Sequence, residues 1–286
     1  MGPGGGAGVR RWAQTRAPPA RLCEDHPMRI ALIGGKGGVG SSLVEAWRAE
    51  HELTVLDRST VPLPGVREVV GEADDPEALT AALEGAEAVV HLAAHLPHGS
   101  EAEQLPGTAA AIGVNVGSVL LAMRLARCLG AGSFVHISSL DVFARYGESP
   151  IPAGALPDAT ALYGLSKRLA EQALRLSVEG PAPTAEEGPL TITSLRLAFP
   201  TTAEAWPRWV TPLREEQAEP VLHTLEDGTP ISSLHPEDLA AAVLAALRRE
   251  RGGAYEAIAV TAAAHSIADD SAARLLDWQP RNVLGE

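Results

Sequence analysis

Short apolar runs alternate with amphipathic segments along most of this 286-residue chain. Five apolar runs bounded by turn residues predict buried strands, at residues 29–33, 53–56, 88–92, 134–137 and 192–197. Apolar positions recur at helical spacing between them, at residues 76–83, 116–129 and 162–176. Strands that alternate with helices favour a parallel sheet covered on both faces, so the pattern predicts an α/β, doubly wound fold.

The two ends of the chain depart from this alternation. Residues 1–27 are rich in Gly, Pro and Arg without apolar periodicity, and Met28 directly precedes the first strand. We expect a disordered N-terminal extension there, with an organellar transit peptide as the alternative. Residues 28–200 form the main domain, and residues 201–286 a small substrate-side lobe. In this lobe a helix at 236–249, a strand at 255–260 and a helix at 267–276 return to the main domain.

Composition narrows the classes of partner. The chain has 23 Lys+Arg and 36 Asp+Glu, a formal charge of −13, and an acidic surface argues against nucleic-acid binding. Two cysteines, Cys23 and Cys128, are too few for a disulfide framework and fit a reducing compartment. No apolar run reaches the roughly 18 residues of a membrane span, so we expect a cytoplasmic protein without a membrane partner.

A glycine-rich turn follows the first strand. Gly34, Gly37 and Gly40 have a spacing that lets the backbone approach a phosphate at the start of the next helix. The same letters resemble the deviant Walker A loop, KGGVGK[ST], of certain ATPases. That loop needs a lysine for the triphosphate, and Ser41 stands in its place. The dinucleotide interpretation is therefore favoured.

Asp57 closes the second strand, the next strand along the chain after the glycine turn. An acidic side chain at this position accepts hydrogen bonds from the adenosine ribose hydroxyls. A carboxylate would repel a 2′-phosphate, which favours NAD. Lys36 and Arg58 could pair with that phosphate, so NADP stays an alternative.

Three further residues carry the candidate chemistry. Tyr163 and Lys167 lie at positions i and i+4 on one helix face, and an adjacent ammonium favours the phenolate form of tyrosine. Such a phenolate can remove a hydroxyl proton. Ser139 follows the strand at 134–137, at the carboxyl edge where parallel sheets bind ligands, and can hydrogen-bond the reacting oxygen.

These motifs together resemble the extended short-chain dehydrogenase/reductases, or NAD-dependent epimerase/dehydratase family. The resemblance runs from about Met28 to the C-terminus, through the segments IGGKGGVG, LD at Asp57, GEADDPEAL, VVHLAAH, VNVGSVLLAMRLAR, VHISSLDVF, YGLSK, SLHPEDLAAAVLAAL and LLDWQPR. It implies a Rossmann fold that binds NAD and a catalytic set of Ser139, Tyr163 and Lys167, with Asn115 holding a water in the proton relay. The cofactor-binding residues it implies are Gly34, Gly37, Val39, Gly40, Asp57, Arg58, Glu72, Ala73, Leu92, Ala93, Ala94, Tyr163 and Lys167.

Some positions depart from the family pattern. Ile33 replaces a common threonine, and Val142-Phe143-Ala144 replaces VYG. Dehydratases of this family carry an Asp-Glu pair after the catalytic Ser or Thr, and Leu140-Asp141 at this point disfavours a dehydratase. The compact lobe and the LLDWQPR ending are similar to uronate dehydrogenases.

The leading hypothesis is an NAD-dependent oxidoreductase or epimerase acting on a sugar, sugar acid or nucleotide sugar. The alternatives are a non-catalytic NAD(P)-sensing regulator and, below it, a deviant-Walker ATPase. If the substrate is a sugar acid, Arg208 is the favoured partner of its carboxylate, ahead of Arg214.

Two expectations concern metals and assembly. His91, His95 and His98 lack a convincing set of further ligands, so no metal site is predicted. The helices at 116–129 and 162–176 carry apolar residues on more than one face, which favours a homodimer.

Overall fold

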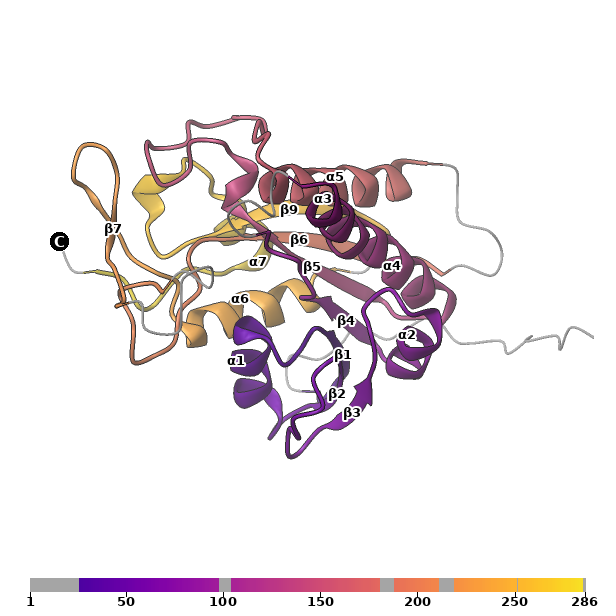
Figure 1. The fold of residues 1–286 in the computed structure, drawn as a ribbon. Helices are drawn as coiled ribbons and strands as arrows, with labels where there is room; N and C mark the ends of the chain where they lie inside the picture. Colours follow the sequence, from indigo (N-terminus) through magenta and orange to yellow (C-terminus); the bar gives the residue numbers. More distant parts are fainter. Residues whose placement is uncertain (1–25, 98–103, 181–187, 211–218, 251, 285–286) are drawn as a thin grey trace, which may run out of the picture.

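A computed structural model describes residues 26–97, 104–180, 188–210, 219–250 and 252–284. Nearly all of the predicted N-terminal extension, residues 1–27, lies outside these ranges. Seven strands form a sheet in the order β3-β2-β1-β4-β5-β6-β9, and every neighbouring pair is parallel (Figure 1). They are β1 (Arg29–Ile33), β2 (Glu52–Asp57), β3 (Arg67–Val70), β4 (Ala88–His91), β5 (Ser133–Ser139), β6 (Thr191–Leu197) and β9 (Tyr255–Val260). This confirms the predicted doubly wound Rossmann-type fold.

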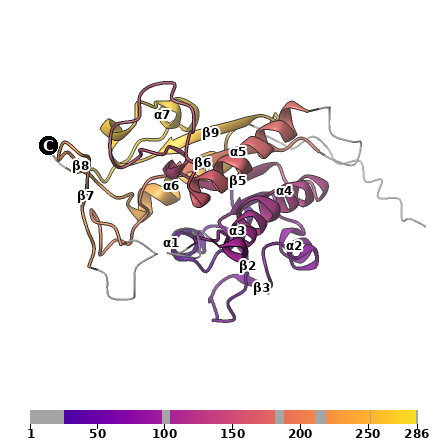
Figure 2. The same ribbon diagram turned by 45° about the horizontal axis from the view of Figure 1, so that its top comes forward.

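Helices cover both faces of the sheet, as Figure 2 shows. Along β1, Ile30 and Leu32 belong to one core cluster while Ala31 and Ile33 belong to another, because successive side chains of a strand point to opposite faces. The first cluster contains residues of α1 (Gly38–Trp47), α6 (Pro236–Leu247) and α7 (Ser271–Leu276). The second contains residues of α2 (Pro76–Leu83), α4 (Val119–Cys128) and α5 (Leu162–Glu179).

A long helix crosses the second face. It consists of α3 (Leu105–Ile112), a π-helical turn η2 (Gly113–Ser118) and α4, and it runs without interruption over Leu105–Cys128. It has 24 residues and contains an 18-residue window of mean hydropathy 1.7, so by length and composition alone it could cross a membrane. The prediction that no apolar run reaches this length is therefore wrong, because the helix begins at Leu105 and not at the predicted Val116. Its inner face packs Val119, Ala122 and Ala126 into the core, each at 0% exposure.

The chain after β6 forms a small hairpin beside the main sheet and then returns to complete that sheet. A two-stranded antiparallel hairpin, β7 (His223–Thr224) and β8 (Pro230–Ile231), stands beside the main sheet. Strand β9 and helix α6 then complete the sheet and its cover. The predicted helix at 267–276 begins only at Ser271, because Ile267 forms a parallel bridge with Ile151.

Candidate active site

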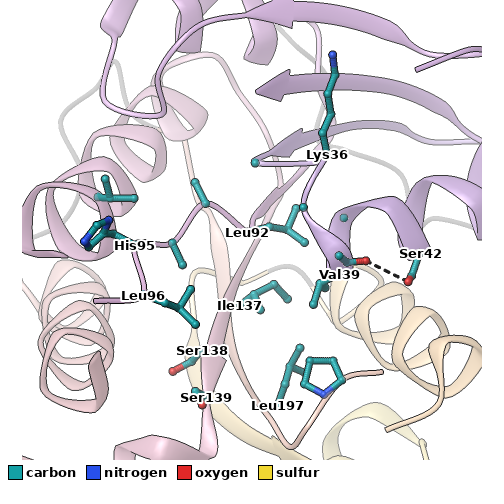
Figure 3. Close-up of a pocket in the computed structure, with 18 of the residues that line it drawn as sticks. Lys36, Val39, Ser42, Leu92, His95, Leu96, Ile137, Ser138, Ser139 and Leu197 are labelled. Carbon is teal, nitrogen blue, oxygen red and sulfur yellow. Dashed lines mark hydrogen bonds between the residues drawn. The ribbon is translucent and has the colours of Figure 1, made fainter. Parts of the chain in front are cut away.

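A cavity of about 750 Å³ opens at the carboxyl ends of the sheet strands (Figure 3). Parallel α/β sheets bind ligands at this edge. Its lining includes all the predicted cofactor-binding residues and Ser139. Asn115 and Arg208 are the two predicted site residues that do not line it.

The glycine turn provides close packing and a free helix end. A Cβ at Gly34, which has φ +81°, would lie 2.6 Å from the Ala93 amide nitrogen, and one at Gly40 would lie 2.5 Å from the Gly35 carbonyl oxygen. Helix α1 then begins without a side-chain cap at Gly37 and without an acidic residue in its first turn. In Figure 3, the Ser42 hydroxyl donates back to the Gly38 carbonyl oxygen, at 3.1 Å. The first-turn amides that line the cavity therefore suit the pyrophosphate of a dinucleotide.

Asp57 lies at the end of the cavity next to the glycine turn. Its carboxylate accepts hydrogen bonds from the backbone amides of Lys36 and Ser59, each at 2.9 Å. The Lys36 ammonium forms an ion pair with Glu68 at 2.5 Å and donates to the Ser59 and Val61 carbonyl oxygens. This cation is engaged by the protein itself, so it does not favour a 2′-phosphate, and the residues present fit NAD.

Helix α5 brings Tyr163 to the end of β5. At Gly164, an added Cβ would overlap the Asp141 carbonyl oxygen and would lie 2.8 Å from the Ala159 Cβ. Only glycine lets the first turn of α5 pack this closely on the turn η3 (Leu140–Val142). The Tyr163 side chain thereby comes within hydrogen-bonding reach of the Ser139 side chain.

Lys167 lies beneath Tyr163, one helical turn further along. Its side chain is 2% exposed, donates from Nζ to the Ile137 carbonyl oxygen at 2.7 Å, and places Nζ 5.8 Å from the Tyr163 ring centroid. Burial lowers the pKa of Lys167 to about 8, and the Glu171 carboxylate opposes this shift.

The electrostatics of Tyr163 differ from the expectation. The sequence interpretation assigned Tyr163 a lowered pKa because of Lys167. In this structure burial raises the pKa of Tyr163, the nearby Asp141 carboxylate raises it further, and only the Ser139 hydrogen bond lowers it. Asp141 was considered at the sequence level only as part of a missing dehydratase pair, so its charge was overlooked.

A buried ion pair, Glu171 with Arg196, lies one helical turn beyond Lys167 on α5. Glu171 accepts two hydrogen bonds from Arg196 Nε and one from its Nη2, at 3.0, 3.2 and 2.7 Å, and another from Ser138 Oγ at 2.7 Å. Sequence reasoning missed this set. The i, i+4 spacing that joins Tyr163 to Lys167 and Lys167 to Glu171 was the available signal.

Asn115 occupies the π-helical turn η2. Its side-chain oxygen accepts from the His95 amide at 2.7 Å, and its Nδ2 donates to the His95 carbonyl oxygen at 2.9 Å and to Ser166 Oγ at 2.8 Å. The side chain thus ties the loop after β4 to α5. Its implied contact with a relay water stays a prediction.

His91, one of the three histidines considered as metal ligands, is engaged within the core. His91 hydrogen-bonds Ser118 Oγ at 2.9 Å, and burial lowers its pKa to about 3, so the ring is neutral. His98 lies outside the described residues. Over the part of the chain that the structure describes, no three His, Cys, Asp or Glu side chains gather as metal ligands.

One wall of the cavity is aromatic. Tyr146, Phe199 and Trp209 line it, and Phe199 stacks on the His223 ring with centroids 4.3 Å apart. Arg208 precedes Trp209, but it is exposed. Arg214, the second candidate, lies outside the described residues. The structure therefore does not bring Arg208, the favoured carboxylate partner, to the site.

The fold and this cavity define a dinucleotide-binding protein with a Ser-Tyr-Lys set. A model of the NAD dependent epimerase/dehydratase family matches residues 30–260, and the chain belongs to this family, as its motifs predicted. Two curated relatives share shorter stretches. The 2′-dehydrokanamycin reductase of Streptomyces kanamyceticus is 29% identical over 54% of this chain and 41% of its own length. The L-arabinose 1-dehydrogenase (NAD(P)(+)) of Haloferax volcanii is 40% identical over 23% of this chain and 26% of its own. The chain thus covers less than half of either relative.

Solved structures share the fold at low identity. A short-chain dehydrogenase/reductase superfamily protein from Agrobacterium tumefaciens, crystallised with NAD, has a TM-score of 0.69 at 19% identity and covers 89% of this chain and 93% of its own. Uronate dehydrogenase from Agrobacterium tumefaciens has a TM-score of 0.65 at 16% identity, over 90% of this chain and 85% of its own.

Proposed function

We propose that this protein is an NAD-dependent oxidoreductase that interconverts a hydroxyl and a carbonyl group on a sugar-type substrate. The observation that carries the proposal is the meeting of Ser139, Tyr163 and Lys167 in a cavity that also holds the glycine turn and Asp57. NAD, when bound, supplies the hydride acceptor or donor of the reaction.

The protein residues handle the proton and the reacting oxygen. Tyr163 exchanges a proton with the substrate oxygen, and the Ser139 hydroxyl hydrogen-bonds and orients that oxygen. Lys167, held by the Ile137 carbonyl oxygen, stabilises the phenolate while its ammonium is charged. Glycine-turn amides hold the cofactor phosphates, and Asp57 receives the adenosine ribose.

We further propose that the sugar carries no carboxylate. The cations among the described lining residues are Lys36, Arg58 and Lys167. Lys36 is paired with Glu68, Arg58 follows Asp57 at the adenosine side, and Lys167 is bonded beneath Tyr163. None of these three belongs to the aromatic wall, whose rings suit the apolar face of a neutral sugar. Both curated relatives are named for reactions on sugar-type compounds, which supports this class.

The assembly proposed for this enzyme is a homodimer through α4 and α5. Leu169 and Leu176 of α5 are 43% and 53% exposed, and Ile112, just before η2, is 37% exposed. A second copy of the chain would cover these side chains across a two-fold axis.

Replacement of Tyr163 by Phe tests the chemistry. We expect turnover to fall at least about 100-fold, because the proton carrier is lost. Binding of NAD, measured by calorimetry, should stay within a few-fold of the unchanged protein. Tyr255→Phe is the matched control, since Tyr255 bonds Ser194 in the sheet and does not line the cavity.

The assay measures NADH formation with neutral aldoses, uronates and nucleotide sugars, and reoxidation of NADH with the corresponding lactones and keto sugars. Undiminished turnover by the Tyr163→Phe protein would overturn the assignment. Tight NAD binding with no turnover on any substrate would favour the NAD-sensing regulator, and uronates as the best substrates would restore Arg208 as a candidate.

A further inference from the structure

Asp141 is an acidic side chain that the catalytic set described above does not include. It lies in η3, just after Ser139, and lines the cavity. Ser139 Oγ donates to Asp141 Oδ2 at 3.0 Å, and the Asp141 backbone amide donates to Ser139 Oγ at 3.1 Å. The Asp141 carboxylate is therefore held by the Ser139 hydroxyl, next to Tyr163 in the cavity lining.

The position of the Asp141 carboxylate lets its charge affect the ionisation of Tyr163. The polar groups that face Tyr163 or line the same part of the cavity come from several elements. They are Ser139 at the end of β5, Asp141 in η3, Tyr146 in the following loop, Lys167 on α5 and His95 in the loop after β4. Among these five described groups, Asp141 is the acidic side chain. Glu171 is not one of them, because it lies behind Lys167 and is paired with Arg196. A negative charge so close disfavours a second negative charge on the phenol.

Resting on the function proposed above, we propose that Asp141 is a positioning residue that holds the Ser139–Tyr163 pair in its protonated, carbonyl-reducing form. In reduction, the carbonyl carbon gains a hydride from the reduced cofactor and the carbonyl oxygen gains the proton of Tyr163. The C=O bond becomes C–OH, the cofactor is left oxidised, and the phenolate regains its proton from solvent. Oxidation runs this sequence backward and needs the phenolate first.

The sign of the pH dependence follows from the charge. Because the Asp141 carboxylate opposes the phenolate, it adds to the rise that burial causes in the pKa of Tyr163, and the protonated form persists to higher pH. Carbonyl reduction is then sustained into alkaline solution, whereas alcohol oxidation begins only at high pH. Removing the Asp141 charge should lower both the pH at which carbonyl reduction is lost and the pH at which alcohol oxidation begins.

Replacement of Asp141 by Asn tests the proposal without a known substrate. The chain has three tyrosines, Tyr146, Tyr163 and Tyr255. Phenolate absorbance is titrated in the cofactor-free protein, and the Asp141→Asn/Tyr163→Phe curve is subtracted from the Asp141→Asn curve to isolate Tyr163. The same subtraction with Tyr163→Phe isolates it in the unchanged protein. We expect the Tyr163 midpoint to fall by about one pH unit or more in the Asn variant.

Asp158→Asn is the matched control. Asp158 is exposed in the neighbouring loop, accepts a hydrogen bond from the Ala144 amide at 2.8 Å, and does not line the cavity. It should leave the Tyr163 midpoint unchanged. Asp141→Ser, which also removes the charge, repeats the measurement should the Asn variant fold poorly.

An unchanged midpoint in both Asp141 variants, or an equal fall in Asp158→Asn, would overturn the proposal. Once a substrate is found, the oxidation limb of Asp141→Asn should also move to lower pH, and an unmoved limb would equally overturn it. Loss of the proposed function gives a different result: the Tyr163 midpoint falls in the Asp141 variants, yet no substrate is turned over by any form.

Discussion

Glu171→Gln removes one charge from the buried Glu171–Arg196 pair, one helical turn beyond Lys167, while it preserves the side-chain shape. Glu171 and Arg196 side chains are 6% and 13% exposed, and three hydrogen bonds join them. The amide cannot accept from both guanidinium nitrogens as a carboxylate does, and its NH₂ group faces Arg196 or Ser138. The change leaves the Arg196 cation without the counter-charge of Glu171 in a poorly solvated position.

The size of the effect follows from this burial. Breaking a buried ion pair by removal of one partner costs about 3–5 kcal/mol. The 13% exposure of Arg196 gives its cation some access to water, so we expect the lower end, about 3 kcal/mol. The cation–π contact of Arg196 with the Phe143 ring, at 5.3 Å, remains in the variant and also reduces the cost of the unpaired cation. The variant should also lower the pKa of Lys167 further, since the Glu171 charge now raises it.

Urea denaturation of four proteins measures the pair directly. Glu171→Gln, Arg196→Met and their double variant are compared with the unchanged chain in a double-mutant cycle. The double variant should cost less than the sum of the single variants by about 2 kcal/mol, because neither charge is then left alone. Additive losses would refute the argument that these two side chains stabilise each other.

Two further outcomes are expected. Glu68→Gln should raise the affinity for NADP relative to NAD several-fold, because Lys36 loses its partner at 2.5 Å and becomes available to a 2′-phosphate. Calorimetry measures both affinities, and an unchanged ratio would contradict the argument that the Lys36–Glu68 pair favours NAD. Light scattering should show a dimer in the unchanged protein, and Leu169→Glu should dissociate it. Leu169 is 43% exposed, so a glutamate at this position would place a charge in the apolar contact between the two copies. A 29.8 kDa species in the unchanged protein would contradict the proposed interface.

Much of the fold follows from apolar periodicity. The strands predicted at residues 29–33, 88–92 and 192–197 match the observed bounds to within a single position at each end, because fully buried parallel strands are continuous apolar runs. The edge strand β3 was missed, since REVV is mostly exposed and begins with an arginine and a glutamate. Helix α3 was missed as well, with Pro106 and Gly107 in its first turn resembling a loop.

The site was predictable where chemistry depends on spacing along the chain. The glycine turn, Asp57, Ser139, Tyr163 and Lys167 all reach the cavity, because each lies at a strand end or on one helix face. Contacts between distant segments could not be predicted in this way. Arg196 lies on β6 and Glu171 on α5, while Lys36 follows β1 and Glu68 lies on β3, so only the folded sheet reveals these partners.

Helix α5 links Tyr163 in the cavity to the core through a single line of side chains. Tyr163, Lys167 and Glu171 follow one another at i, i+4 spacing, so the same helix face passes from the cavity to the buried ion pair. A buried ammonium is costly, and the lowered pKa of Lys167, about 8, shows that cost. The Glu171 charge opposes the loss of the lysine proton from one side, while Asp141 opposes phenolate formation at Tyr163 from the other. The protonation of Tyr163 and Lys167 therefore depends on two carboxylates, neither of which needs to touch the substrate in the proposed reaction.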